Sequence, residues 1–255
     1  MTEQIRAAGL AAQYALQVDH VASEAATPRT TTPAMPMMKE QMETTAPTAT
    51  PIADHRVTIE DDATPIVRLI GRTLRDAVQQ RHAPYAFGSY SGSVAVRSHA
   101  TPQAATVTFA DDAVTVTGGV FAPTDATVVV DLDARFTSVA MEGDAEIADW
   151  LLRALQVPQP EWRTAAARFW EITRDVRGIP DVLVAVASGP DGREEARFGA
   201  GTNVYRVVGT PDVLAGLFTG SDFLFTALAR GLRVQGTLAQ LSAMTAASWK
   251  ARFDV

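Results

Sequence analysis

The 255-residue chain contains no cysteine, and its only lysines are Lys39 and Lys250. Without cysteine there are no disulfides, no thiolate nucleophiles and no cysteine-ligated zinc or iron–sulfur sites, which agrees with a reducing cytoplasm. A net charge of −7 with so few lysines argues against a protein that neutralises nucleic-acid phosphates. We therefore expect a cytoplasmic protein that does not bind nucleic acid.

Long apolar runs are also missing from the sequence. No run reaches the ~18–20 residues that a membrane-spanning helix needs. The first residues, MTEQIRAAGLAAQYALQV, lack the charged and then apolar layout of a signal peptide. We therefore expect no transmembrane segment.

Motifs for catalysis and metal binding are scarce. GSYSG at 88–92 carries Tyr90 where a nucleophile elbow needs serine. GAGTNV at 199–204 lacks the third glycine of a dinucleotide loop and precedes a predicted strand, whereas phosphate binding needs a helix N-terminus there. The four histidines are not spaced for a metal ion: His20, His55, His82 and His99. We expect a non-catalytic protein without metal ion or cofactor, and keep an enzyme using Tyr90, His82 and nearby serines as an alternative.

The N-terminal region has an unusual composition. Five of the fourteen prolines, four of the seven methionines and eight threonines fall within residues 26–53, and no periodicity supports a packed core there. Before them, Leu10, Tyr14 and Val18 are spaced to form one apolar stripe on a short helix, which would need a surface to dock on. We predict that residues 1–59 form a disordered extension. Two interpretations of its short helix stay open: a peptide that docks on a partner, and a frayed leader without a function.

The remaining sequence changes between helical and strand-like patterns. From Glu60, acidic residues followed by apolar residues at helical spacing predict a helix, and a second helix is predicted from about 136 to 155. Four strand-like stretches lie between the two helices, with a hairpin turn at 110–113: 93–96, 105–109, 114–116 and 126–130.

A similar series begins at Pro160. It predicts a helix that ends near Gly178, a hairpin over 181–200 and a third strand at 202–209. Two short helices, a short strand and a closing helix follow in turn, at 212–218, 221–229, 232–235 and 237–249.

The two series align at a constant offset of 77 residues. GDAEIADWLLRALQV at 143–157 falls on GSDFLFTALARGLRV at 220–234, so the short strand in GLRVQGTL has a weaker copy in ALQVPQP at 154–160. The spacing predicts a tandem duplication of an α+β unit, the first at 60–159 and the second at 160–255. Two prolines stand in the first unit where the second begins its closing helix, so the first unit is degenerate.

The stretch DVLAGLFTGSDFLFTALARGL at 212–232 carries more apolar residues than a helix on one sheet face needs. The surplus must meet a second apolar surface, which is another helix, the other unit or a ligand. Ordinary core packing and an apolar ligand cavity are both open interpretations.

The second unit resembles the sterol carrier protein domain, a family of lipid-transfer proteins. The resemblance rests on the order of elements and on VYRVVGTPDVLAGLFTG and LARGLRVQGTLAQL within 204–241. It covers most of 160–255, and the first unit matches less well. It implies an α+β fold of two sterol-carrier-like units, each a small, mostly antiparallel sheet covered by helices, with an apolar tunnel in the second.

The resemblance also implies a function and a site. The function is non-catalytic binding or carriage of an apolar ligand, such as a lipid, a sterol-like molecule or an isoprenoid. Carried over by position, nine side chains line the tunnel: Phe198, Tyr205, Leu217, Phe218, Phe223, Leu224, Leu228, Leu241 and Met244. The alternative is an interaction or cargo protein tethered to a larger assembly or protein shell through residues 1–55. The sequence leaves open whether the units face each other in one chain or pair across a dimer.

Overall fold

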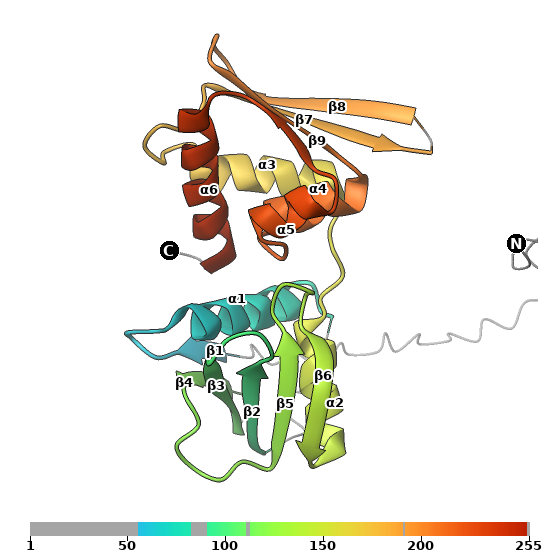
Figure 1. The fold of residues 1–255 in the computed structure, drawn as a ribbon. Coiled ribbons are helices and arrows are strands. Elements are labelled where there is room, and N and C mark those ends of the chain that lie inside the picture. The colour runs from blue at the N-terminus through green and yellow to red at the C-terminus, as the bar shows by residue number, and fades with distance from the viewer. Residues whose placement is uncertain (1–55, 83–90, 111–112, 191, 254–255) are drawn as a thin grey trace, which may run out of the picture. The chain divides into compact units, whose positions relative to one another are not determined.

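The computed structural model describes residues 56–82, 91–110, 113–190 and 192–253. These residues form an α+β fold with two mixed sheets, one of six strands and one of four (Figure 1). We call residues 56–159 the N-terminal half and residues 160–253 the C-terminal half. The predicted docking helix and the threonine-rich stretch lie outside the described residues.

The N-terminal half contains six strands and two helices. In chain order they are β1 (Arg56–Ile59), α1 (Pro65–Gln79), β2 (Gly92–Ser98), β3 (Ala104–Ala110), β4 (Ala113–Gly118), β5 (Ala126–Asp131), β6 (Thr137–Gly143) and α2 (Ala145–Leu155). The strand order in the sheet is β1-β4-β3-β2-β5-β6. Because β1 pairs in parallel with β4, the sheet begins at Arg56, before the predicted start of the unit at Glu60.

One face of this sheet forms the first core. Alternate residues of β2 to β5 are buried against apolar residues of α1 and α2, as the two-residue period of a strand requires. The largest strand residue in this core, Phe109, meets the ring of Trp150 from α2 edge-on, with ring centroids 4.9 Å apart. Helix α1 begins with Pro65, whose fixed φ suits the first helical position, and buries Ile66, Ile70 and Leu74.

The C-terminal half contains four strands and four helices. In chain order they are α3 (Trp162–Thr173), β7 (Val182–Gly189), β8 (Gly192–Gly199), β9 (Val204–Gly209), α4 (Pro211–Thr219), α5 (Leu224–Ala229), β10 (Arg233–Gln235) and α6 (Leu238–Phe253). The strand order is β10-β9-β7-β8. The helices pack with one face of the sheet in a second core, and Val182, Val184 and Val186 are buried on its other face.

A four-strand arrangement recurs in the two halves. Strands β3-β2-β5-β6 are joined by antiparallel, parallel and antiparallel pairing, and β8-β7-β9-β10 follow the same pattern. In both halves a helix precedes the first of these strands and another follows the last: α1 and α2 in one, α3 and α6 in the other. This topology pairs β10 with β6. The alignment at an offset of 77 residues is therefore wrong in register, because 154–160 contain the end of α2 and a linker and no strand.

The predicted helix at 136–155 is wrong over its first part. Residues Thr137–Gly143 form strand β6, which pairs with β5 at the sheet edge and has all seven residues exposed. An edge strand exposed on both faces shows no alternation of apolar and polar residues, so the sequence carries no strand signal there. Helix α2 begins only after Gly143, and the side chain of Asp144 accepts a hydrogen bond from the backbone N–H of Glu146 at 2.9 Å.

The GLRVQGTL segment forms the junction between β10 and α6. Gly231 has φ +95°, a left-handed conformation that favours glycine, and a Cβ on Gly236 would lie 2.5 Å from Cδ2 of Tyr205. Thr237 and Gln240 then cap α6 reciprocally: Thr237 Oγ1 accepts from the Gln240 N–H at 3.2 Å, and Gln240 Oε1 accepts from the Thr237 N–H at 2.6 Å. Gly231 therefore shapes the passage from α5 into β10, and Gly236 with the cap shapes the chain reversal that places α6 on the sheet.

Candidate functional site

Eight of the nine predicted tunnel residues come together in the second core. Five of them are buried: Tyr205, Leu217, Phe218, Leu224 and Met244. Three more are partly buried and pack against these: Phe198, Leu228 and Leu241. The structure thus brings strand β8, strand β9 and helices α4, α5 and α6 to one apolar cluster, as the predicted site requires. Their role in holding a ligand stays a prediction.

Phe223 is placed apart from the other predicted tunnel residues. Its ring lies 5.2 Å from that of Phe225 and 6.0 Å from that of Trp249, measured between centroids. Trp249 in turn contacts Phe253. Phe225 and Trp249 are large exposed apolar residues, so Phe223 belongs to a surface aromatic cluster of α5 and α6.

The hydroxyl of Tyr205 is a buried polar group of the second core. Its side chain is 1 % exposed, and its hydroxyl has no hydrogen-bond partner among the residues that the structure describes. Burial raises the pKa of this phenol to about 12, so the hydroxyl keeps its proton at neutral pH. A buried hydroxyl without a partner costs roughly 1–3 kcal/mol and calls for an explanation.

A second polar feature is the ionic cluster that links the two halves. The turn between β5 and β6 holds Arg135 and Phe136 at φ 52° and 60°, left-handed conformations that cost energy for residues with a side chain. This turn directs Arg135 to two carboxylates, that of Asp212 in the first turn of α4 and that of Asp222 after the end of α4.

The geometry of this cluster is that of a buried carboxylate held by two guanidinium groups. Asp222, which has no exposed side-chain surface, accepts from Arg135 Nε at 2.7 Å and Nη2 at 2.6 Å, and from Arg230 Nη1 at 2.8 Å. The hydrogen bonds to Asp222 raise the pKa of Arg135 above its usual range. The hydrogen bond from Arg135 holds the pKa of Asp212 below its usual range. Every member of the cluster therefore has an opposite charge beside it.

Buried Arg252 of α6 adds a further link between the halves. It donates to the backbone carbonyls of Gly220 and Ser221 at 3.0 and 2.9 Å, and to that of Leu132 at 3.0 Å. Burial lowers the pKa of this arginine. These three acceptors lie just after α4 and in the β5–β6 turn. Arg252 therefore contacts both the β5–β6 turn and the segment after α4, which Arg135 also connects.

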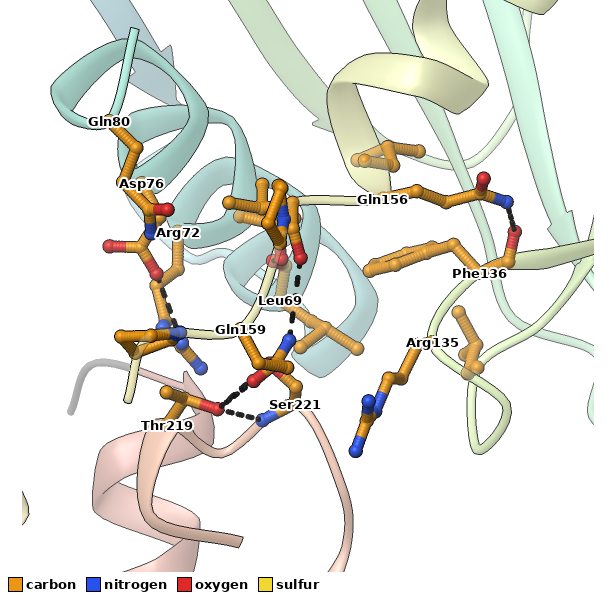
Figure 2. Close-up of a pocket in the computed structure, with 16 residues that line it drawn as sticks. Leu69, Arg72, Asp76, Gln80, Arg135, Phe136, Gln156, Gln159, Thr219 and Ser221 are labelled. Atoms are coloured by element: carbon orange, nitrogen blue, oxygen red, sulfur yellow. Dashed lines mark hydrogen bonds and ion pairs between the residues drawn. The ribbon is translucent and has the colours of Figure 1, made fainter. Parts of the chain in front are cut away.

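Two adjoining hollows lie between α1 and the C-terminal half. The first, drawn in Figure 2, is bordered by α1 and the linker after α2; there Gln159 contacts Thr219 and Ser221 at 2.8 and 3.2 Å. Its volume is about 40 Å³, which is room for a few water molecules. The second, which we call the α1–α3 cleft, has a volume of about 410 Å³, within the range of small-molecule sites.

The α1–α3 cleft has a charged wall and an apolar floor. Its charged side chains are Arg72, Arg75 and Asp76 of α1 and Arg168 of α3. Its apolar residues include Ala165, Ile172, Phe218 and Ala251. Phe218 also packs on Phe169 in the second core, with ring centroids 5.2 Å apart, so the cleft reaches that core at one point.

The candidates for chemistry in the sequence do not gather at either hollow. His82 Nε2 lies 3.0 Å from the carbonyl of Arg153, and the His99 N–H donates to the carbonyl of Val130. Tyr90, His20 and His55 lie outside the described residues. Within the described ranges, no group of three or more histidine, aspartate or glutamate side chains is arranged to hold a metal ion.

Comparisons with known proteins give no relative. No protein-family model matches the chain, and neither curated proteins nor solved structures include one that is similar to it. Among the described helices, none is both long and apolar enough to cross a membrane. Function must therefore be argued from the arrangement of side chains.

Proposed function

We propose that the protein binds an apolar small molecule without catalysis, in the interior of its C-terminal half between the four-stranded sheet and helices α4, α5 and α6. The ligand classes that suit such an interior are lipids, sterol-like molecules and isoprenoids. The proposal includes a cytoplasmic location, which the lack of cysteine favours.

The unpartnered hydroxyl of Tyr205 is the observation that carries the proposal. Tyr205 lies in β9 on the face that packs against the helices, where it is in register with Leu183 of β7. A ligand with one hydroxyl or carbonyl group would supply the missing hydrogen bond while its apolar body replaces side-chain contacts. The energy that the free protein loses on the unpaired hydroxyl would then be recovered on binding.

The clustering of the predicted tunnel residues gives further support. Eight of them share one core although they come from five different elements of the chain. Burial of ten ligand methylenes in such surroundings is worth roughly 8 kcal/mol before entropy costs. Apolar burial thus supplies the affinity, and the Tyr205 hydroxyl sets the orientation of the ligand.

The first experiment asks whether the protein holds an apolar molecule at all. The full chain is purified and extracted with organic solvent, and the extract is analysed by mass spectrometry. The delipidated protein is then titrated with dehydroergosterol, a fluorescent sterol with one hydroxyl. We expect a co-purified apolar molecule and saturable binding of the sterol. An empty extract together with no binding of the sterol or of a fluorescent fatty acid would contradict the proposal.

The second experiment tests the hydroxyl of Tyr205. A Tyr205→Phe variant should bind the hydroxylated sterol about 3–10-fold more weakly, the factor expected for one hydrogen bond. The ligand-free variant should be at least as stable as wild type, because it no longer buries an unpaired hydroxyl. The matched control is the same sterol without its hydroxyl group, which both proteins should bind equally. Equal binding of the hydroxylated sterol by both proteins would remove Tyr205 from the site.

A further inference from the structure

The α1–α3 cleft concentrates positive charge in an acidic protein. Three arginines and one aspartate line it, whereas the chain as a whole has a net charge of −7. A hollow in which positive side chains outnumber negative ones, set between low-dielectric walls, focuses the electric field and raises the local concentration of anionic ligands. The positive charge of the cleft lining is therefore opposite to the net charge of the protein.

The two helices contribute arginines at different depths of the cleft. Arg72 of α1 is 13 % exposed and pairs with Asp76 at 3.0 Å. Arg168 of α3 is 66 % exposed and lies 3.7 Å from the other oxygen of the same carboxylate. One carboxylate thus stands between guanidinium groups from both helices, and a single negative charge does not balance them. Arg72 Nη1 also donates to the backbone carbonyl of Arg252 at 3.4 Å, so the more exposed Arg168 is the guanidinium group that an added anion would meet first.

The remaining lining suits the body of an organic molecule. Gln79, Gln80 and Thr164 supply neutral hydrogen-bonding groups, and Phe218 and Ile172 supply apolar surface. Ile172 is itself one of the large apolar residues that the described part of the chain leaves exposed. Guanidinium groups match the planar geometry of carboxylates and phosphates, which they bind through paired hydrogen bonds.

We propose that the α1–α3 cleft binds an organic anion, in which a carboxylate or phosphate group meets Arg72 and Arg168 and a small apolar body lies against Phe218 and Ile172. This site is separate from the interior around Tyr205, and its ligand differs in chemistry. Arg168 lies at the open side of the cleft, because its side chain is the more exposed of the two. Asp76 lowers the affinity for the anion, because its carboxylate competes for the same guanidinium groups.

The test uses probes that differ only in their head group. Calorimetric titrations of the full chain compare octanoate, octyl phosphate, 1-octanol and inorganic phosphate. We expect both amphiphilic anions to bind at least about fivefold more tightly than 1-octanol, and to weaken as salt is added. The tighter of the two anions identifies the head group. Inorganic phosphate that binds as tightly as octyl phosphate would overturn the role of the apolar floor.

Variants of exposed and paired residues locate the site. Arg168→Gln should weaken both anions about fivefold or more and leave 1-octanol unchanged. Asp76→Asn should strengthen both anions, a gain that damage to the fold would not produce. The matched control is Arg174→Gln, which removes the same charge just after the end of α3, at a side chain that pairs with Glu171 outside the cleft.

Two outcomes would overturn the proposal. In one, Arg168→Gln binds the anions as tightly as Arg174→Gln does; in the other, Asp76→Asn fails to strengthen them. Neither outcome bears on the interior site, because dehydroergosterol binding is measured separately and does not involve the arginines. Conversely, failure of sterol binding together with octanoate binding that Arg168→Gln weakens would leave the cleft as the only supported site.

Discussion

In the N-terminal half, β5 and β6 are joined by residues 132–136, whereas the C-terminal half places α4 and α5 between the equivalent strands β9 and β10. The shared strand order shows that the sheet does not depend on this connection. The connection decides what covers the sheet, because two additional helices bring a second apolar layer into the C-terminal half. That layer packs in the same core as Tyr205, whose hydroxyl has no partner in the described part of the chain. Among the described residues of the N-terminal half, the buried side chains are apolar.

The two differing connections also meet each other. Arg135 lies in the short β5–β6 turn, and Asp222 lies between α4 and α5. The strain of two left-handed residues in the turn is balanced by the ion pairs that the turn makes possible. The connection between these two strands thus differs between the halves, and it supplies both the second apolar layer of the C-terminal half and the ionic contact between the halves.

The largest expected difference between the halves concerns their cores. Phe109 and Phe218 are both fully buried, but Phe218 also borders the α1–α3 cleft. Phe109→Ala should lower the free energy of unfolding by about 3–5 kcal/mol, because it leaves a closed cavity. Phe218→Ala should cost less, because the space it vacates joins an existing hollow that water can enter. Urea denaturation of both variants checks this order, and an equal or larger cost for Phe218→Ala would contradict it.

The ionic contact between the halves gives the next largest effect. Asp222→Ala leaves two guanidinium groups without their buried acceptor and should cost about 2–4 kcal/mol. Asp212→Ala removes a carboxylate that pairs with the same two arginines but is 54 % exposed, and should cost less than about 1 kcal/mol. Chemical denaturation of this matched pair separates the effect of burial from that of charge. Similar costs would show that the buried carboxylate contributes no more than the exposed one.

A smaller effect is expected where β10 passes into α6. Gly236→Ala places a methyl group 2.5 Å from the ring of Tyr205 and should cost about 1–3 kcal/mol. Because the close atom belongs to the ring, a second change of Tyr205→Phe should add no more stability than it adds to wild type, whereas Tyr205→Leu should offset part of the cost of Gly236→Ala. Thermal unfolding of Gly236→Ala, of the two double variants and of Tyr205→Phe alone measures this. Rescue by Tyr205→Phe would show that the hydroxyl, and not the ring, sets the packing.

The sequence predicted most elements because they carry one-sided apolar patterns. Helix α1 and strands β2 to β5 bury alternate or periodic residues, so their positions were confirmed to within a few residues. Strand β6 was missed because no residue of it is buried. The repeat was aligned in the wrong register because similarity between α2 and the α5–β10 segment says nothing about backbone pairing, which alone identifies β10 with β6.

The candidate sites also contain some features that the sequence predicts and others that it does not. The apolar residues of the second core were predictable from their positions, but the missing partner of the Tyr205 hydroxyl depends on every neighbour that surrounds it. Arg72 and Asp76 stand four residues apart on a helix, a spacing that predicts an ion pair. Arg168 joins them from another helix, and Arg135 meets Asp222 across 87 positions, so neither contact leaves a signal in the sequence.

The smallest expected effect is a pH dependence of the contact between the halves. Arg135 holds the pKa of Asp212 below its usual value, so the stability from this carboxylate is present above its unfolded pKa of about 3.9 and is lost as pH falls through the folded pKa. Wild type should therefore exceed Asp212→Asn in urea midpoint by a constant, small amount from pH 7 to about pH 5, and the gap should close below about pH 4. Asp133→Asn, which removes an exposed carboxylate 3.7 Å from Arg252, serves as the control for loss of surface charge. Replacement of Arg135 by glutamine should reduce the pH-dependent part of the gap and leave the smaller part that Arg230 contributes. A gap that persists unchanged at pH 3 would contradict the assignment to Asp212.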